Sequence, residues 1–300
     1  MTVESNPVPL GTWAAYLVGL VYILPRIAAR WFPQVWFCLT CVILLTMLYI
    51  MCFLVDKVRY LGVPRITTHG FCCWLAMAFF NLCIWLNPQM RVVDRGSTAQ
   101  WSQVPKGAYV LANHTSFFDS FVITASLPTA IALRVRVIFK ASLRKIPLFG
   151  PLFYYWGHFP VYYSSEESKN FSVDRTKQEA SNALLEKFLA AKDGYLVVFP
   201  EGVVNLEQPN LLPFRHGAFS LAIKHKIPLY AFLHSGNQVI WPPQDKVGGH
   251  RGTVTTRLVK LDVDYEAEGL TAKTLAESCQ GQMQLHMDEV WKINRQMLKD

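Results

Sequence analysis

The sequence predicts an α/β domain with a mostly parallel β-sheet flanked by helices, preceded by an N-terminal region of membrane-embedded helices. Three observations lead to this prediction. Hydrophobic residues make up 52% of the 300-residue chain and charged residues 17%, whereas soluble domains carry about 25% charged residues. The longest apolar, charge-free stretches lie before residue 90. From residue 91, short apolar runs alternate with amphipathic segments, which is typical of strands alternating with helices.

The N-terminal region, residues 1–90, is predicted to hold one to three membrane spans. Residues 10–24, 35–55 and 71–86 are apolar runs without charge. A helix over 35–55 extends about 31 Å, the thickness of a hydrocarbon core, so we expect a transmembrane helix there. The other two runs are predicted to span, to re-enter or to lie in the interface, and buried core helices are the alternative. Lys and Arg are spread evenly over the connections, so the positive-inside rule gives no orientation.

The charge and the cysteines narrow the class of protein. The formal net charge of +8 on an apolar chain favours an anionic membrane or phosphate-bearing substrates over nucleic acid. Six of the seven cysteines lie in the apolar first third, which indicates small packing residues and no disulfide framework. The cysteines and histidines show no metal-ligand spacing, so no metal site is predicted. His216, His225 and His234 are expected to have structural or surface roles.

Residues 91–300 are predicted to form the second domain, which ends in a long C-terminal helix. Apolar runs bounded by turn residues predict the strands, and apolar periodicity of 3.6 predicts the helices. The predicted strands are Tyr109–Ala112 and residues 135–139, 159–163, 195–199, 229–233 and 253–263. The predicted helices are residues 176–192, 218–225 and 270–298.

The first chemical motif directly follows the strand Tyr109–Ala112, where residues 113–119 read N-H-T-S-F-F-D. This is an H-x₄-D pattern formed by His114 and Asp119. If a helix begins near Ser116, the turn before it can place the carboxylate against one imidazole nitrogen and leave the other as a base. The pattern alone is weak, and a solvated histidine beside a helix-capping aspartate is the alternative.

Two further motifs follow strands or precede helices. Residues 199–202 read F-P-E-G at the end of a predicted strand, which presents Glu201 at the carboxyl edge of the sheet, where ligands of α/β proteins bind. Residues 213–217 read P-F-R-H-G, so Arg215 lies just before a predicted helix and could bind phosphate with its N-terminal amides. Taken singly, an exposed turn and a surface arginine explain these two motifs. Lys140 belongs to a small basic cluster with Arg144 and Lys145, which is typical of a solvated or membrane-facing surface.

Together these blocks resemble the glycerolipid acyltransferases of the lysophosphatidic acid acyltransferase (PlsC-type) superfamily. The resemblance covers about residues 105–235 and includes the proline-bearing strand I-P-L at 227–229. It implies the glycerolipid acyltransferase fold. It also implies transfer of an acyl group from acyl-CoA or acyl carrier protein to the hydroxyl of a lysophospholipid or glycerol phosphate, with acyl-CoA as a co-substrate and no cofactor.

The resemblance also implies roles for single residues. His114 corresponds to the base that deprotonates the acceptor hydroxyl, and Asp119 to the residue that orients it. Glu201 and Gly202 belong to the acceptor site, and Arg215 matches the basic position before Gly217. We therefore expect a 1-acylglycerol-3-phosphate O-acyltransferase of phospholipid biosynthesis. It would be integral to the endoplasmic reticulum membrane, with the catalytic domain, residues 91–300, facing the cytosol. The sequence gives no prediction of oligomeric state.

Two positions depart from the family pattern. The second block usually ends in arginine, and Tyr163 stands there; F-P-E-G is usually followed by threonine, and Val203 stands there. The phosphate contact is then missing or is supplied by Lys140, Arg175 or Arg215.

Two alternative functions remain. Residues 199–205 and the H-S-G at 234–236 also resemble tafazzin-like transacylases, which exchange acyl chains between phospholipids without CoA. A catalytically silent membrane scaffold of the same fold is the other alternative. No acyl-enzyme is expected, because Cys279 has no motif around it and Ser116 lacks a nucleophile elbow.

Overall fold

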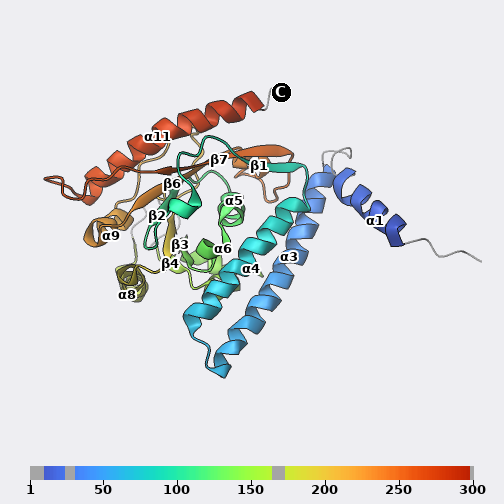
Figure 1. The fold of residues 1–300 in the computed structure, drawn as a ribbon, viewed down its shortest axis with the longest axis horizontal. Helices are drawn as coiled ribbons and strands as arrows, with labels where there is room; N and C mark the ends of the chain where they lie inside the picture. The colour runs from blue at the N-terminus through green and yellow to red at the C-terminus, as the bar shows by residue number, and fades with distance from the viewer. Residues whose placement is uncertain (1–9, 24–30, 164–172, 298–300) are drawn as a thin grey trace, which may run out of the picture.

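The central element is a seven-stranded β-sheet with the order β1-β7-β6-β2-β5-β3-β4 (Figure 1). The structure, a computed structural model, describes residues 10–23, 31–163 and 173–297. Neighbouring strands are parallel except for the antiparallel pair β6–β7, so the predicted mostly parallel sheet is confirmed. The strands are β1 (Met90–Asp94), β2 (Tyr109–Ala112), β3 (Val135–Lys140), β4 (Phe159–Val161), β5 (Tyr195–Val198), β6 (Leu229–Ser235) and β7 (Gly252–Lys260).

Helices cover both faces of the sheet. The helices are α1 (Leu10–Val18), α3 (Trp31–Lys57), α4 (Arg65–Trp85), α5 (Asp119–Ser126), α6 (Thr129–Ala132), α7 (Phe149–Trp156), α8 (Arg175–Ala191), α9 (Gly217–His225), α10 (Asn237–Ile240) and α11 (Ala272–Met297). Shorter turns of 3₁₀ or π type are Gly19–Ile23, Val58–Leu61, Trp101–Gln103 and Ala141–Lys145.

Alternating residues of the central strands β2, β5 and β6 enter two separate hydrophobic cores. On β2, Val110 and Ala112 pack with α3, α4, α5 and α7, and Tyr109 and Leu111 pack with α8, α9 and α11. This is the period-2 alternation of a strand that is buried on both faces. The result is a three-layer α/β arrangement in which β2, at the centre of the sheet, is fully buried.

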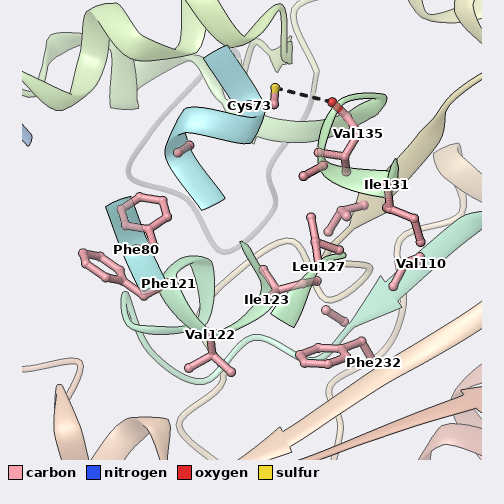
Figure 2. Packing of buried hydrophobic residues seen from close by; sticks show 14 of the residues in the cluster. Cys73, Phe80, Val110, Phe121, Val122, Ile123, Leu127, Ile131, Val135 and Phe232 are labelled. Atoms are coloured by element: carbon pink, nitrogen blue, oxygen red, sulfur yellow. Dashed lines mark hydrogen bonds between the residues drawn. The ribbon is translucent and has the colours of Figure 1, made fainter. Parts of the chain in front are cut away.

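The first apolar layer is built around an antiparallel pair of long helices, α3 and α4, which we call the hairpin (Figure 1). Gly62, with φ of 87°, makes the turn between them, and Pro64 precedes α4. Helix α4 lies along α5, α6 and α7, and Figure 2 shows Phe80 of α4 beside Phe121 of α5. Small residues permit this close approach, since Cys73 of α4 contacts the carbonyl of Val135 in β3.

Two described helices, Phe32–Leu61 and Arg65–Trp85, are long and apolar enough to cross a membrane. The first contains the predicted run at 35–55, and the second contains the predicted run at 71–86 except for its last residue, Leu86. In the most apolar stretch of Phe32–Leu61, 22% of the window is buried inside the protein. In that of Arg65–Trp85 the share is 44%, because α4 lies against the α/β layers. The first run, residues 10–24, forms α1 and a π turn up to Ile23, and Leu24 lies outside the described residues. The number of spans and the division at residue 90 stay predictions.

Some elements differ from those expected. The helix after the first motif begins at Asp119 and not near Ser116, because residues 116–118 form a turn. Strand β4 ends at Val161, although Tyr163 forms an isolated bridge with Val173. Strand β1 and helices α6, α7 and α10 were not predicted. The other predicted strands and helices are present, with ends shifted by at most three residues within the described chain.

Two helical glycines test the close packing of the hairpin. A Cβ on Gly70 of α4 would lie 2.2 Å from the carbonyl oxygen of Leu133, whereas a Cβ on Gly281 of α11 would meet nothing within 4 Å. We expect Gly70→Ala to lower the stability by about 1–3 kcal/mol, because α4 must move away from the domain. Gly281→Ala should raise it by about 0.5–1 kcal/mol. Thermal unfolding in detergent measures both, and equal effects of the two variants would contradict the packing described.

Candidate active site

The first motif forms a hydrogen-bonded histidine–aspartate pair at the carboxyl end of β2. His114 follows the strand directly, and Asp119 is the first residue of α5. The His114 Nδ1 and Asp119 Oδ2 atoms are 2.8 Å apart. The His114 side chain is 23% exposed and that of Asp119 is fully buried. The structure therefore brings together the two residues that the H-x₄-D pattern predicted, with Nε2 of His114 as the ring nitrogen left for chemistry.

Asp119 is buried as an ionised group because donors surround it. Its Oδ2 also accepts hydrogen bonds from the backbone amides of Thr115 and Ser116, and its Oδ1 accepts from the Thr115 hydroxyl and the Asn237 amide. Burial by itself would raise the pKa of Asp119. The attraction that the nearby His234 ring exerts when it is protonated, and the hydrogen bonds from His114 and Asn237, outweigh it and hold the pKa of Asp119 below its usual value. The carboxylate thus stays charged and fixes a proton on His114 Nδ1.

The F-P-E-G turn lies beside this pair, and Glu201 connects the two. Glu201 is 1% exposed. Its Oε1 accepts from the backbone amide of His114, and its Oε2 accepts from Asn205 Nδ2 and the backbone amide of Leu212. Burial raises the pKa of Glu201, and these hydrogen bonds offset the effect only in part. With both oxygens engaged inside the protein, Glu201 positions the His114 backbone. That Glu201 belongs to the acceptor site, as the resemblance implied, stays a prediction.

The ring of Phe199 packs against His114, with the ring centroids 4.7 Å apart. The turn after it needs glycine, since Gly202 has a φ of 73° and a Cβ there would lie 3.2 Å from Cγ of Arg215. The Arg215 backbone amide donates to the carbonyl of Pro200, so the turn carries Arg215 directly above Gly202. Gly217 begins α9 two residues later, as predicted.

The remaining predicted residues lie at the same edge of the sheet or beyond it. Lys140 ends β3, the neighbour of β5, and pairs with Val161 of β4. Tyr163 is partly buried, and burial raises the pKa of its phenol while nearby Arg215 opposes the rise. The phenol that replaces the family's arginine therefore stands within electrostatic reach of Arg215. Arg175, the first residue of α8, shows no contact with this group, and Val203 lies partly buried in the turn.

Three polar side chains of the site were not predicted from the sequence. Asn113 clamps β6 through both amide atoms, with its Oδ1 accepting from the His234 amide and its Nδ2 donating to the His234 carbonyl. Asn205 holds Glu201, and Asn237 holds Asp119. The asparagine in front of the histidine was visible in the first motif. The pairing of Asn237 with Asp119 spans 118 residues and leaves no local sequence signal.

The carboxyl edge of the parallel sheet thus carries a positioned imidazole and, above Gly202, an exposed arginine, an arrangement suited to group transfer. The Acyltransferase family model matches residues 95–235, the part of the chain that contains His114, Asp119, Glu201 and Arg215. This match, the similar proteins and the shared fold support an assignment to the lysophosphatidic acid acyltransferase (PlsC-type) superfamily.

Proteins of similar sequence and fold support the same assignment. The chain is 27% identical over 200 residues to a putative 1-acyl-sn-glycerol-3-phosphate acyltransferase of Caenorhabditis elegans, covering 67% of this chain and 64% of the relative. It is 26% identical over 207 residues to the 1-acyl-sn-glycerol-3-phosphate acyltransferase of Saccharomyces cerevisiae, covering 68% and 61%. The chain thus spans less than two thirds of the length of these relatives. The crystal structure of the acyltransferase PlsC from Thermotoga maritima shares the fold, with a TM-score of 0.55 and 18% identity over 81% of this chain and 95% of that chain.

The lowered pKa of Asp119 predicts a pH-dependent stability. The buried carboxylate contributes stability above its unfolded-state pKa, and this contribution is lost as the pH falls through the lower folded-state pKa. We expect Asp119→Asn to lower the stability by about 1–3 kcal/mol near pH 7, and the gap to the wild type should narrow as the pH falls below 4. Thermal unfolding between pH 7 and pH 3 measures this gap, with exposed Asp262→Asn as the control. A gap that is independent of pH would contradict a buried, charged Asp119.

Proposed function

We propose that the chain is a membrane-bound acyltransferase of the 1-acylglycerol-3-phosphate O-acyltransferase type. It transfers a fatty acyl group from acyl-CoA to the hydroxyl of lysophosphatidic acid or a related lysophospholipid and forms a diacyl phospholipid. The observation that carries the proposal is the His114–Asp119 pair, 2.8 Å apart, with the ring of His114 partly exposed at the sheet edge. The names of the similar proteins support the substrate class.

The geometry supports a general-base mechanism. Nε2 of His114 takes the proton from the acceptor hydroxyl while Asp119 holds Nδ1 and stabilises the imidazolium. The hydroxyl oxygen attacks the thioester carbonyl and gives a tetrahedral intermediate. The intermediate collapses by breaking the C–S bond, and the leaving CoA sulfur receives the proton from the imidazolium. The neutral imidazole is then restored and the acyl ester is released.

Direct transfer is favoured over a covalent acyl-enzyme. Cys279 is fully buried in the core under α11, and burial raises the pKa of its thiol to about 12. The Ser116 hydroxyl donates to the carbonyl of Trp241 and is held away from nucleophilic attack. Neither side chain is an activated nucleophile.

Arg215 and the N-terminus of α9 are the proposed site for the acceptor phosphate. The arginine is exposed above Gly202, and the first amides of α9, a helix of nine residues, follow it. A guanidinium and helix N-terminal amides are a favourable combination for phosphate. Tyr163 beside Arg215 adds a neutral phenol where the family carries a second positive charge. Lys140, at the end of β3, is a further proposed contact.

The hairpin is the proposed membrane anchor. Its outer face is an exposed apolar stripe on α3 with spacings of three or four residues, formed by Val35, Leu39, Val42, Ile43, Met47, Ile50 and Leu54. A contiguous apolar stripe of this length on a protein surface indicates contact with lipid or another protein. Both substrates carry acyl chains that partition into lipid, so a membrane position brings them to the site. We further propose an endoplasmic reticulum location with the α/β domain on the cytosolic side, on the strength of the family resemblance.

Removal of the base tests the reaction. We expect His114→Ala to reduce acyl transfer by about 10²–10⁴-fold, because the variant lacks the proposed base. Membrane fractions are assayed with labelled oleoyl-CoA and a panel of lysophosphatidic acid and lysophosphatidylcholine. His286→Ala on α11 is the control, and transfer by His114→Ala at the wild-type rate would refute the proposal.

The same assay without CoA distinguishes the tafazzin-like alternative. A transacylase would move labelled chains from a diacyl phospholipid to a lysophospholipid with no thioester present. We expect no such exchange, and His114-dependent exchange in its place would assign the CoA-independent reaction. No His114-dependent transfer with any donor would favour the catalytically silent scaffold.

Charges in the apolar stripe test the anchor. We expect Leu39→Asp, Ile43→Asp and Ile50→Asp together to release the folded protein from liposomes, because each charge costs about 2.5–3.5 kcal/mol in the middle of a membrane helix. The matched control carries aspartate at three exposed leucines elsewhere, Leu184, Leu206 and Leu285. Liposome flotation measures the bound fraction, and equal binding by both triple variants would show that the stripe does not contact lipid.

A further inference from the structure

A second imidazole lies directly behind the His114–Asp119 pair, and the mechanism does not use it. His234, on β6, is fully buried. Its Nδ1 is 3.0 Å from Nδ2 of Asn237 and 3.8 Å from Oδ1 of Asp119. Its Nε2 is buried and has no hydrogen-bond partner among the described residues. The backbone of His234 is clamped on both sides by Asn113. The ring is therefore fixed in place and cannot reach a substrate.

The hydrogen bonds define where the protons are. Nδ2 of Asn237 lies 2.7 Å from Oδ1 of Asp119, and a carboxylate can only accept, so the amino side of the Asn237 amide faces Asp119. The second hydrogen of the same amino group then points to Nδ1 of His234, which must be an acceptor. This assigns His234 as a neutral imidazole with its proton on Nε2, an assignment made from the network.

The ionisation of His234 is consistent with this assignment. Burial lowers the pKa of His234, and the attraction of Asp119 opposes the shift only in part. A proton on Nδ1 would also confront the N–H of Asn237. The titratable groups that face Asp119 and His114 are His234 on β6 and Glu201 after β5, whose carboxylate holds the His114 backbone. Among the described residues, Asp119 is thus the one carboxylate that is hydrogen-bonded to the imidazole ring of His114, through Oδ2. Asn237 donates to the other oxygen, Oδ1.

We propose that Asn237 and His234 are positioning residues for acyl transfer. Asn237 holds Oδ1 of Asp119, and neutral His234 accepts the other Asn237 hydrogen and sets the plane of the amide. Oδ2 is thereby kept on Nδ1 of His114, and part of the carboxylate charge is drawn away from it. The inference rests on the proposed function, because the base that the two residues orient is the base of that reaction.

Two substitutions remove, one at a time, the hydrogen bond between Asn237 and Asp119 and the hydrogen bond between Asn237 and His234. Asn237→Leu removes the donor to Asp119, and His234→Leu removes the acceptor that orients Asn237. In both variants the charge of Asp119 acts more strongly on His114, so the acidic limb of the pH profile of kcat/KM should move up by roughly 0.5–1 pH unit. We expect kcat to fall by about 10–100-fold with the KM for acyl-CoA unchanged, as is typical when a partner of a functional side chain is lost.

A conservative variant and a structural control separate positioning from packing. The side-chain oxygen of glutamine can accept from Asn237, so His234→Gln should recover a wild-type pH profile. Asn294 is also a buried amide, and it donates to the carbonyls of Ser235 and Thr253 beside the same strand without touching Asp119. Asn294→Leu should lower the melting temperature and leave the acidic limb in place. If all four variants lower stability and none moves the limb, the two residues are structural only and the inference is overturned.

A readout without catalysis keeps this inference separate from the proposed function. In ¹⁵N-histidine NMR of the detergent-solubilised chain, the His234 signals are assigned by their loss in His234→Gln. We expect a neutral ring protonated on Nε2 from pH 5 to pH 8. A cationic ring or a proton on Nδ1 would overturn the inference even if the enzyme is active. If the wild type transfers acyl groups and His114→Ala does so at the same rate, the proposed function is overturned. The protonation state of His234 measured by NMR would not be affected by that result.

Discussion

The buried charge of Asp119 is the constraint on which the rest of the site depends. A carboxylate removed from water is stable only where donors replace its hydration. Here the donors come from the turn after β2, from α10 and from His114 itself. Because Asp119 is the first residue of α5, the positive end of that helix also favours the charge. The turn, the start of the helix and the orientation of the base are therefore consequences of satisfying one ion.

A second buried carboxylate, Glu201, joins the turns that follow β2 and β5. These strands are neighbours in the sheet, so their carboxyl ends meet at one edge. The hairpin is connected to the same turn by the contacts of Phe37 with Trp241, whose carbonyl accepts from Ser116. The apolar anchor and the base are thus linked through a few aromatic and backbone contacts. In the proposed reaction, this places the base close to the surface from which lipid substrates arrive.

Sequence patterns predicted the parts of the molecule that are encoded locally. The strand Tyr109–Ala112 and the helix after Asp174 have continuous or periodic apolar residues, and both were found. Strand β1 was missed because Met90–Asp94 is short and carries charges at Arg91 and Asp94. Helix α7 was missed because it is aromatic on nearly all sides and has no polar face. The antiparallel direction of β7 depends on the path of the preceding loop, which periodicity does not report.

The site itself was predictable to the level of residue types and their spacing. The pairing of His114 with Asp119 follows from five residues of separation and a turn. The inward orientation of Glu201 and the contact of Asn237 with Asp119 arise from segments 87 and 118 residues apart, so only the fold reveals them. His234 was expected to have a structural or surface role, and its buried place behind Asp119 is likewise revealed only by the fold.

The central claim is that His114 acts directly on the acceptor hydroxyl. An experimental structure with a bound, non-reactive ether analogue of lysophosphatidic acid tests this most directly. We expect the free hydroxyl of the analogue within about 2.6–3.2 Å of Nε2 of His114, with the phosphate beside Arg215. A hydroxyl bound elsewhere, with the His114 ring turned into the protein, would contradict it.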